Sequence, residues 1–500
     1  MRARLLMSAG ALALIAGPAQ AETLREALAK AYASNPTITA ARAQQRATDE
    51  NVPIARAAGL PSVTTSTDFS QNLLRGGNSL TNPTRRLNAF GGVNIPVYSG
   101  GAVRNSVRAA ETRVEAGQAT LRNTEATTFT DVVSAYNNVI RDEAIVGLSQ
   151  QNLKVLDTNL RASRDRFEVG DLTRTDVAQS EARLSLARAQ LQQAQAGLIA
   201  SREDYVRLVG SPPGELAPPP PLPNLAVTSD AAVEVALADN PALLASAKLR
   251  DAAADDVKVA RAGRLPQFGV TVGQNYNNFL GSLGAGQGFS TQQSGTSTVG
   301  GVSLSLPIFQ GGRVGAQIRQ AQARRAQAIE QATATERQVI AATRSAYAIW
   351  KSSLEVIESA ETAVKANRLS LEGVRAENSV GTRTILDILN AEQELLNAQV
   401  TLVTARRDSY VAGFALLAAM GRAEADDLGL EGGPLYDPTL NYQRVRRRMN
   451  DFANDKSPEP LASSTRGTTA QDARVSRPLD PILDQPVDRD LSNPSGTTPK

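Results

Sequence analysis

The chain contains two copies of one pattern, and this duplication limits the folds that it can adopt. Pro61 returns as Pro266 at an offset of 205 residues, and Pro96 returns as Pro307 at an offset of 211 residues. The offset grows by six between these prolines, where loops are expected. Each half therefore predicts the same series of elements. Further matched pairs are Asn35 with Asn240, Tyr136 with Tyr347 and Gly210 with Gly421.

A short stretch near residue 380 predicts a tight tip between two antiparallel helices. Gly381 offers a position with positive φ, where a helix can end. Thr384 and Asp387 have the spacing of a capping box, which begins the next helix. The chain therefore predicts two helical hairpins, because this tip occurs twice. The first copy of the tip consists of Gly170, Thr173 and Asp176.

Each half is predicted to run as a helix, a pair of strands, a very long helix, a tip and a shorter helix. In the first half the helix covers 35–60, the strands lie within 62–98 and the long helix covers about 103–169. In the second half the strands lie within 267–309 and the long helix covers about 314–380. A helix of about 67 residues spans roughly 100 Å. The two shorter helices, stacked end to end, nearly match that length.

The helices that return from the tips carry an apolar repeat of seven residues. A strict heptad predicts left-handed supercoiling against a neighbouring helix. Alanines three positions further on allow a close approach of the helices. The repeats are Val177, Leu184, Leu191, Leu198 and Tyr205 in the first half, and Ile388, Leu395, Leu402, Ser409 and Leu416 in the second half.

The composition excludes most classes of enzyme active site. The 500 residues include no cysteine and no histidine, which excludes disulfides, zinc–thiolate sites, cysteine nucleophiles and histidine bases. The sequence also lacks the glycine-rich motifs that bind phosphate. The 53 basic and 50 acidic residues nearly balance, so the charge gives no argument for nucleic acid. We therefore expect no enzyme activity, no cofactor and no metal site.

Both ends of the chain, and its middle, carry segments outside the repeats. A charged start, an apolar run and Ala19-Gln20-Ala21 predict a secretory signal that is cut after Ala21. The run of four prolines at 218–221 predicts a stiff connector. The predicted division is a signal peptide at 1–21, repeat 1 at 22–210, a proline-rich linker at 211–228, repeat 2 at 229–421, an equatorial C-terminal segment at 422–450 and a disordered tail at 451–500.

The predicted strands require several copies of the chain if they lie in lipid. Each strand of about ten residues has the length of a tilted membrane-spanning β-strand. Two strand pairs cannot close a barrel alone, and open strand edges are not tolerated in lipid. Three chains would supply twelve strands and six tips.

With these features the chain resembles the TolC family of outer membrane efflux ducts. The resemblance rests on the signal sequence, the doubled Asn-Pro, the Leu-Pro ends at Pro61 and Pro266, and the stretches 304–312 and 379–387. It covers about 22–448, and the missing lipobox cysteine indicates the non-lipidated branch. It implies an α+β membrane protein with two internal repeats. Three copies would form a twelve-stranded outer membrane β-barrel that continues into a long periplasmic α-helical coiled-coil barrel.

The resemblance implies an exit duct without enzyme activity. Such a homotrimer lies in the outer membrane and extends into the periplasm. It docks with a periplasmic adaptor protein and an inner membrane pump of RND, ABC or MFS type. It then passes drugs or secreted proteins outward, as part of a tripartite efflux pump or a type I secretion system. The alternative is a structural trimeric coiled-coil surface protein without a pore, which the doubled antiparallel tips argue against.

The resemblance also assigns roles to single residues. Arg383 and Asp176 match positions that tie neighbouring tips together in the closed state, with Thr175 as a supporting hydroxyl. Asp387 matches a ring of acids at the constriction of the tip. The positions that match the adaptor-contacting signatures are Val169, Gly170, Val380, Gly381 and Thr382.

The sequence departs from the family pattern at three positions. Asn378 stands where the family often has tyrosine, which puts one gate hydrogen bond in doubt. Asn390 replaces a second acidic ring, which leaves one ring of three carboxylates. Asp171 replaces a leucine in the first tip, which alters the surface offered to the adaptor.

Two of the assignments have an alternative. Asp176 and Asp387 are also the acids of capping boxes, and a carboxylate that folds back onto its helix points away from a pore. Tyr98 and Phe309 precede the glycine pairs at the strand ends. They fit either an interfacial aromatic belt or a core at the strand–helix junction.

Overall fold

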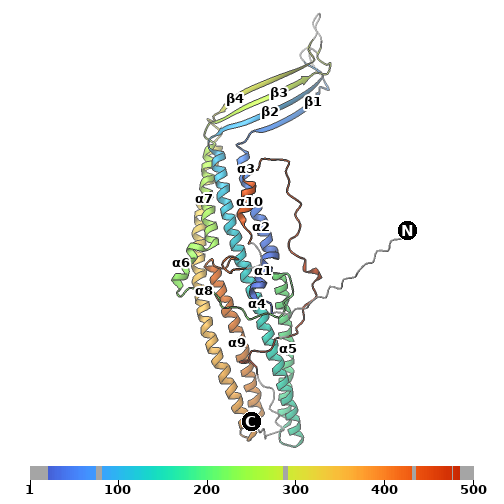
Figure 1. Cartoon of the computed structure of the whole chain (residues 1–500), viewed down its shortest axis with the longest axis vertical. Coiled ribbons are helices and arrows are strands. Elements are labelled where there is room, and N and C mark those ends of the chain that lie inside the picture. The colour runs from blue at the N-terminus through green and yellow to red at the C-terminus, as the bar shows by residue number, and fades with distance from the viewer. Residues whose placement is uncertain are drawn as a thin grey trace, which may run out of the picture.

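The chain folds into an elongated column with a four-stranded sheet at one end and two hairpin tips at the other (Figure 1). The predicted signal peptide lies outside the described residues apart from its last residue, and so does the end of the tail. The computed structural model describes residues 21–74, 82–223, 225–284, 291–430, 435–475 and 477–484.

The predicted series of elements is present in both repeats, and each repeat begins with one further helix, α1 or α6, that was not predicted. The first repeat consists of α1 (Leu24–Ser34), α2 (Pro36–Asp49), α3 (Asn51–Ala57), β1 (Ser62–Gln71), β2 (Arg85–Ser99), α4 (Ala102–Glu168) and α5 (Arg174–Val209). The second repeat consists of α6 (Ser229–Asp239), α7 (Pro241–Ala262), β3 (Gln267–Asn278), β4 (Ser294–Ser305), α8 (Arg313–Ser379) and α9 (Ile385–Ala419). A helix α10 (Pro438–Val445) and a short 3-10 turn (Thr465–Gly467) follow.

The helix predicted over 35–60 is divided at Glu50 into α2 and α3. Pro53 explains the division, because proline has no N–H for the helical hydrogen bond and its ring disfavours a continuous helix. The matching position of the second repeat is Lys258, and there α7 continues without a break from Pro241 to Ala262. One residue therefore accounts for the difference between the repeats.

The long and return helices pair into two hairpins. In the first hairpin α5 packs along α4, and in the second α9 packs along α8. The predicted heptads form these contacts, since Leu184, Leu198, Leu395 and Leu402 are all buried. The two hairpins contact each other mainly through α4 and α9. Among the described residues, no helix is both long enough and apolar enough to cross a lipid bilayer.

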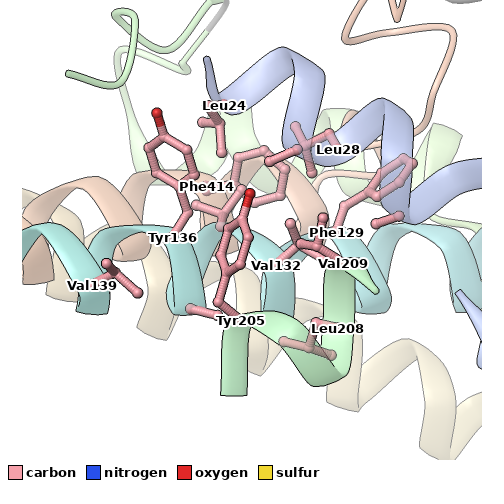
Figure 2. Packing of buried hydrophobic residues seen from close by; sticks show 14 of the residues in the cluster. Leu24, Leu28, Phe129, Val132, Tyr136, Val139, Tyr205, Leu208, Val209 and Phe414 are labelled. Carbon is pink, nitrogen blue, oxygen red and sulfur yellow. The ribbon is translucent and has the colours of Figure 1, made fainter. Parts of the chain in front are cut away.

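The largest core lies halfway along the column, where α1 crosses the first hairpin (Figure 2). Leu28 of α1 packs in one cluster with Phe129 and Tyr136 of α4 and Tyr205 of α5, and Phe414 of α9 completes the cluster. All five side chains are almost fully buried. This core therefore joins both hairpins to the first helix of the chain.

Two buried tyrosines bind the beginning of the described chain to the linker. The Tyr136 hydroxyl lies 2.8 Å from the Glu22 carbonyl and 2.7 Å from the Ala217 carbonyl, so one of these oxygens accepts its proton. The Tyr205 hydroxyl donates to Glu22 Oε1 at 2.9 Å. Glu22 also pairs with Leu216 of the linker in a parallel β-bridge. The proline-rich linker is therefore held against the core rather than spanning free solvent.

The four strands form one antiparallel sheet in the order β1-β2-β3-β4. The central pair β2–β3 joins the two repeats, and a register shift between Pro96 and Tyr98 bends β2 near the helices. Among the described residues, β1 and β4 have no partner on their outer edges. The sheet is therefore open on both sides.

The described part of the tail differs from the predicted disorder. Residues 451–475 and 477–484 follow a defined path beside the helices (Figure 1). Leu483 is only 3% exposed, and Arg202 donates to backbone carbonyls of the tail. The composition of this segment suggested disorder because few of its residues are apolar. A few of its residues nevertheless bind the buried Arg202 and pack in an apolar cluster of the hairpins.

A buried ion pair connects α4 with α2. Glu125 is 8% exposed, and its Oε1 lies 3.8 Å from Arg42 Nη2. The Arg42 guanidinium also stacks on the rings of Tyr32 and Tyr436, at 4.2 and 4.9 Å from their centroids. Burial is the largest influence on Glu125 and raises the pKa of its carboxyl from 4.5 to about 7. Arg42 and Arg122 oppose this rise, and Glu424 adds to it.

The raised pKa of Glu125 predicts a pH-dependent stability. The folded pKa lies above the unfolded value of 4.5, so ionised Glu125 destabilises the fold as pH rises from about 4.5 through about 7. We expect Glu125→Gln to remove a loss on the order of 1–3 kcal/mol between pH 5 and pH 8. Denaturant unfolding at both pH values measures this difference. The control is Glu115→Gln, at an exposed position of α4; equal pH dependence in wild type and Glu125→Gln would contradict the prediction.

Candidate functional site: the hairpin tips and the open sheet

Both tips end their long helices in the same way. Val169 and Val380 cap α4 and α8, and the glycines that follow have φ of 84° and 81°. In the first tip, Gly170 N–H donates to the Phe167 carbonyl at 3.0 Å and Asp171 N–H donates to the Arg166 carbonyl at 2.8 Å. This pair of bonds is the Schellman motif, and the second tip repeats it. A side chain with a Cβ would be strained at either glycine.

Both return helices begin with the predicted capping box. Asp387 Oδ2 accepts from the Thr384 N–H at 2.9 Å and from the Thr384 hydroxyl at 2.8 Å. Asp176 Oδ2 does the same for Thr173, at 3.0 and 2.7 Å. The Thr384 N–H bond is the largest cause of a lowered pKa at Asp387. The capping alternative for both aspartates is therefore the arrangement seen in the single chain.

The second tip has additional side-chain hydrogen bonds that were not predicted from the sequence. Arg383 Nε donates to Glu377 Oε2 at 2.7 Å, and this bond is the largest cause of a raised pKa at Arg383. Asn378 Nδ2 donates to the Arg383 carbonyl at 2.7 Å. The Thr382 hydroxyl donates to the Glu377 carbonyl at 2.8 Å. Asn378 thus supports the turn of its own tip, where the family pattern suggested a missing gate bond.

The predicted gate residues do not meet within one chain. In the described residues, Arg383 pairs with Glu377 of its own tip rather than with Asp176 of the first tip. Thr175 is exposed in the first turn of α5. A hydrogen bond does link the two hairpins near the tips, but through another pair, in which Arg183 Nη2 donates to Asn390 Oδ1 at 2.8 Å. Their separation by 207 residues left no local signal in the sequence.

A second missed contact lies one turn above the tip. Arg375 of α8 forms an ion pair with Glu392 of α9, whose side chain is 4% exposed. Burial is the largest influence on Glu392 and raises the pKa of its carboxyl, while Arg375 opposes the rise. This pair joins the two helices of the second hairpin just above its turn.

The positions predicted to meet an adaptor form an exposed surface at the end of the column. Val169 is 80% exposed and Val380 is 74% exposed. Gly170, Gly381 and Thr382 are also exposed. An exposed valine at the same position of both tips has no role in the core of the single chain. The tips therefore offer two similar apolar points to another molecule.

At the opposite end, the register of the sheet separates apolar and polar side chains onto two faces. Neighbouring residues of a strand point to opposite faces. Threonines, glycines, a few amides, Ser294 and Arg85 fill the remaining positions of the apolar face. Its apolar and aromatic residues are Val63, Phe69, Leu87, Ala89, Val93, Ile95, Phe268, Val270, Val272, Tyr276, Val302 and Leu304. The polar face carries Ser62, Thr64, Ser66, Asp68, Arg86, Asn88, Asn94, Thr271, Asn275, Asn277, Ser297 and Ser303.

The apolar face is open to the surroundings. Val63 is 78% exposed, Phe69 60% and Val302 73%. On the polar face, Phe90 covers Gly92 and Gly273, where an added Cβ would lie 2.6 and 2.7 Å from ring atoms. The glycines thus make room for one aromatic ring among polar side chains. Val299 is a second apolar side chain on this face and is 64% exposed, whereas most of the other side chains there carry hydrogen-bonding groups.

The two aromatic residues at the strand ends are also exposed. Tyr98 is 51% exposed, and Phe309 is 86% exposed. Neither forms part of a buried cluster at the strand–helix junction in the described residues. Their exposure favours a position at the boundary of the apolar face over packing in a core.

The comparisons with known proteins agree with this geometry. A family model for the outer membrane efflux protein matches residues 27–211 and 232–422, one segment in each repeat. The outer membrane efflux protein BepC of Brucella suis biovar 1 is 36% identical over 428 residues, which is 86% of this chain and 91% of BepC. The outer membrane protein TolC of Escherichia coli K12 is 27% identical over 470 residues, 90% of this chain and 94% of TolC.

A solved structure shows the same fold. The Campylobacter jejuni CmeC outer membrane channel superposes with a TM-score of 0.70 at 16% identity. The match covers 86% of this chain and 90% of CmeC. The fold therefore extends over nearly the whole of both chains.

The capping boxes predict a local effect on stability. Thr384→Ala and Thr173→Ala each remove an N-cap hydroxyl, which costs about 1 kcal/mol at a helix start. We expect faster amide hydrogen exchange in the first two turns of α9 or α5, with the rest of the column unchanged. Thr401→Ala, at an exposed position in the middle of α9, is the control. Unchanged exchange at the altered tip would show that the caps are dispensable.

Proposed function

Because the chain belongs to the outer membrane efflux protein family, we propose that three copies form an exit duct. The duct crosses the outer membrane and continues as a helical tunnel into the periplasm. Its cargo consists of drugs or secreted proteins. A periplasmic adaptor and an inner membrane pump of RND, ABC or MFS type deliver that cargo.

The two-faced sheet is the observation that carries this proposal. An exposed apolar face suits contact with lipid, and a polar face on the other side suits a water-filled lumen. The unpaired edges of β1 and β4 need partners in lipid, because an open edge leaves backbone groups without hydrogen bonds. Three copies of a four-stranded sheet supply a closed barrel of twelve strands. Tyr98 and Phe309 then belong to its interfacial aromatic belt.

The tips are the proposed docking end. Exposed valines at equivalent positions of both tips support an adaptor that binds each hairpin in the same way. Three copies present six such tips. The proposed contact residues are Val169, Gly170, Val380, Gly381 and Thr382.

The tips also form the proposed gate. In the closed assembly, Arg383 releases Glu377 of its own tip. It pairs instead with Asp176 of a neighbouring tip, where the Thr175 hydroxyl supports the contact. Asp387 adds a ring of three negative charges at the constriction. Its lowered pKa keeps the carboxylate ionised while it caps α9. The cap uses one oxygen of the carboxylate, so the charge remains at the tip.

Single-channel recording in a planar bilayer tests the duct. We expect the mature protein to give stable, small, cation-selective currents, because the tip end is closed at rest and lined by acids. Large unselective currents would support the proposed duct but contradict the proposed gate at the tips. A folded protein that gives no currents would contradict the duct and favour a structural trimer.

Arg383→Ser tests the gate in the same recordings. The substitution removes the cation that holds neighbouring tips together, so we expect a higher conductance of the purified trimer. Arg344→Ala, which changes an exposed arginine of α8 far from the tip, is the matched control. If Arg383→Ser and wild type conduct equally, Arg383 has no part in the gate.

Asp387→Asn separates the charge of this residue from its capping role. Asparagine keeps a side-chain oxygen for the Thr384 N–H but carries no charge. We expect a weaker cation preference and weaker block by trivalent cations, with hydrogen exchange at the tip unchanged. Thr384→Ala should instead speed hydrogen exchange at the tip and leave the cation preference and the block by trivalent cations unchanged. Retention of both cation preference and block in Asp387→Asn would leave Asp387 as a cap only.

A further inference from the structure

The C-terminal segment crosses both hairpins of the chain. We call residues 471–475 and 477–484 the strap. It passes from the upper part of α5 over α4 to α9 and α8 (Figure 1). These four helices otherwise form two separate hairpins that touch mainly through α4 and α9. The strap is therefore a further connection between the two hairpins.

A buried arginine anchors the strap to the first hairpin. Arg202 of α5 is 9% exposed, and its Nη1 donates to the Asp472 carbonyl at 2.7 Å. Its Nη2 donates to the Arg474 carbonyl at 2.8 Å and to Glu143 Oε1 of α4 at 2.6 Å. Without the strap, these donors would lose three acceptors, namely the two carbonyls and Asp472 Oδ1, which lies 3.2 Å from Nη1, and leaving buried donors unpaired is costly. The site on Arg202 is thus built to hold an extended backbone.

Polar side chains anchor the strap to the second hairpin. Arg406 of α9 donates to Asp480 Oδ2 at 2.9 Å. Gln399 of α9 donates from Nε2 to the Leu483 carbonyl at 2.9 Å. Arg368 of α8 donates to the Ile482 carbonyl at 2.6 Å. Most of these bonds go to backbone carbonyls, so they fix the path of the strap.

Two leucines of the strap fill apolar positions on the hairpins. Leu483 is 3% exposed and packs in one cluster with Leu148 of α4, Val364 of α8 and Leu402 of α9. Leu479 lies against Gly147 of α4, where an added Cβ would be 2.9 Å from its Cδ2. The cluster that contains Leu483 therefore includes residues from both hairpins. Leu483 would be exposed if the hairpins moved apart at this level.

We propose that the strap is a clamp that sets the spacing of the two hairpins, so that the tips separate fully only after it detaches. Closer to the tips, Leu389 and the pair Arg183–Asn390 also connect the hairpins. These contacts involve α4, α5 and α9, whereas the strap reaches all four helices. The clamp concerns the geometry within one protomer and holds whether or not the tips gate a pore. It gives the C-terminal segment a role beyond that of the proposed duct.

The distance between the two tips tests the clamp. The chain has no cysteine, so Asp171→Cys and Ser379→Cys place one spin label on each exposed tip. Labelled chains are diluted with unlabelled chains, so that pulsed electron paramagnetic resonance reports distances within one protomer. We expect a chain truncated after residue 467 to show a broader distribution shifted to longer distances. A chain truncated after Asp484 keeps the strap and should match the full chain.

Two substitutions in the full chain decide the question if the truncated chain does not fold. Leu483→Asp places a charge in the apolar cluster, and Arg368→Ala removes an exposed anchor without altering the core. Both should broaden the distribution, and Arg344→Ala on the same helix should not. Narrow, unshifted distributions in both strap variants would overturn the clamp. Bilayer currents from the same variants test the proposed duct separately. A variant that loses its current but keeps the tip distance of the wild type would contradict the duct and not the clamp.

Discussion

The open sheet imposes the strongest physical requirement on this protein. Each chain exposes an apolar face, which is unfavourable in water, and two unpaired strand edges, which are unfavourable in lipid. A closed barrel formed with further copies of the chain accommodates both the apolar face and the strand edges. It covers the edges with backbone hydrogen bonds and directs the apolar face outward. The helical column then continues from a closed ring of strands, and its tips gather at the far end.

The duplication explains why one chain can build two hairpins with equivalent tips, and the differences between the repeats show where they diverge. Pro53 breaks the first short helix, whereas Lys258 leaves the second continuous. The second tip has the bond from Arg383 to Glu377, and the described residues of the first tip show no equivalent, because Leu172 and Arg166 occupy the matching positions. The repeats thus share their backbone turns and differ in the side chains that tie those turns to their surroundings.

Local patterns in the sequence predicted the fold well, because the forces behind them act over a few residues. Gly381 with Thr384 and Asp387 specified a tip, and leucines such as Leu395 marked the buried side of a return helix. The contacts that the sequence did not reveal join distant segments. Arg183 with Asn390 is one such pair, and Arg202 with the strap is another. No short-range rule connects these positions, so they appear only in three dimensions. The docking of the tail was missed for the same reason, because its few anchoring residues bind distant helices and the rest of the segment is polar.

Disulfide trapping between strand edges tests the closure of the sheet most directly. The chain has no native cysteine, so Ser66→Cys in β1 can be combined with single cysteines at positions 296–300 of β4 in the purified, membrane-inserted protein. The account predicts that at least one combination gives a covalently closed trimer under oxidising conditions, and that none of the single-cysteine variants does. Monomers at every position of this scan, from protein that remains folded, would contradict a barrel built from neighbouring copies.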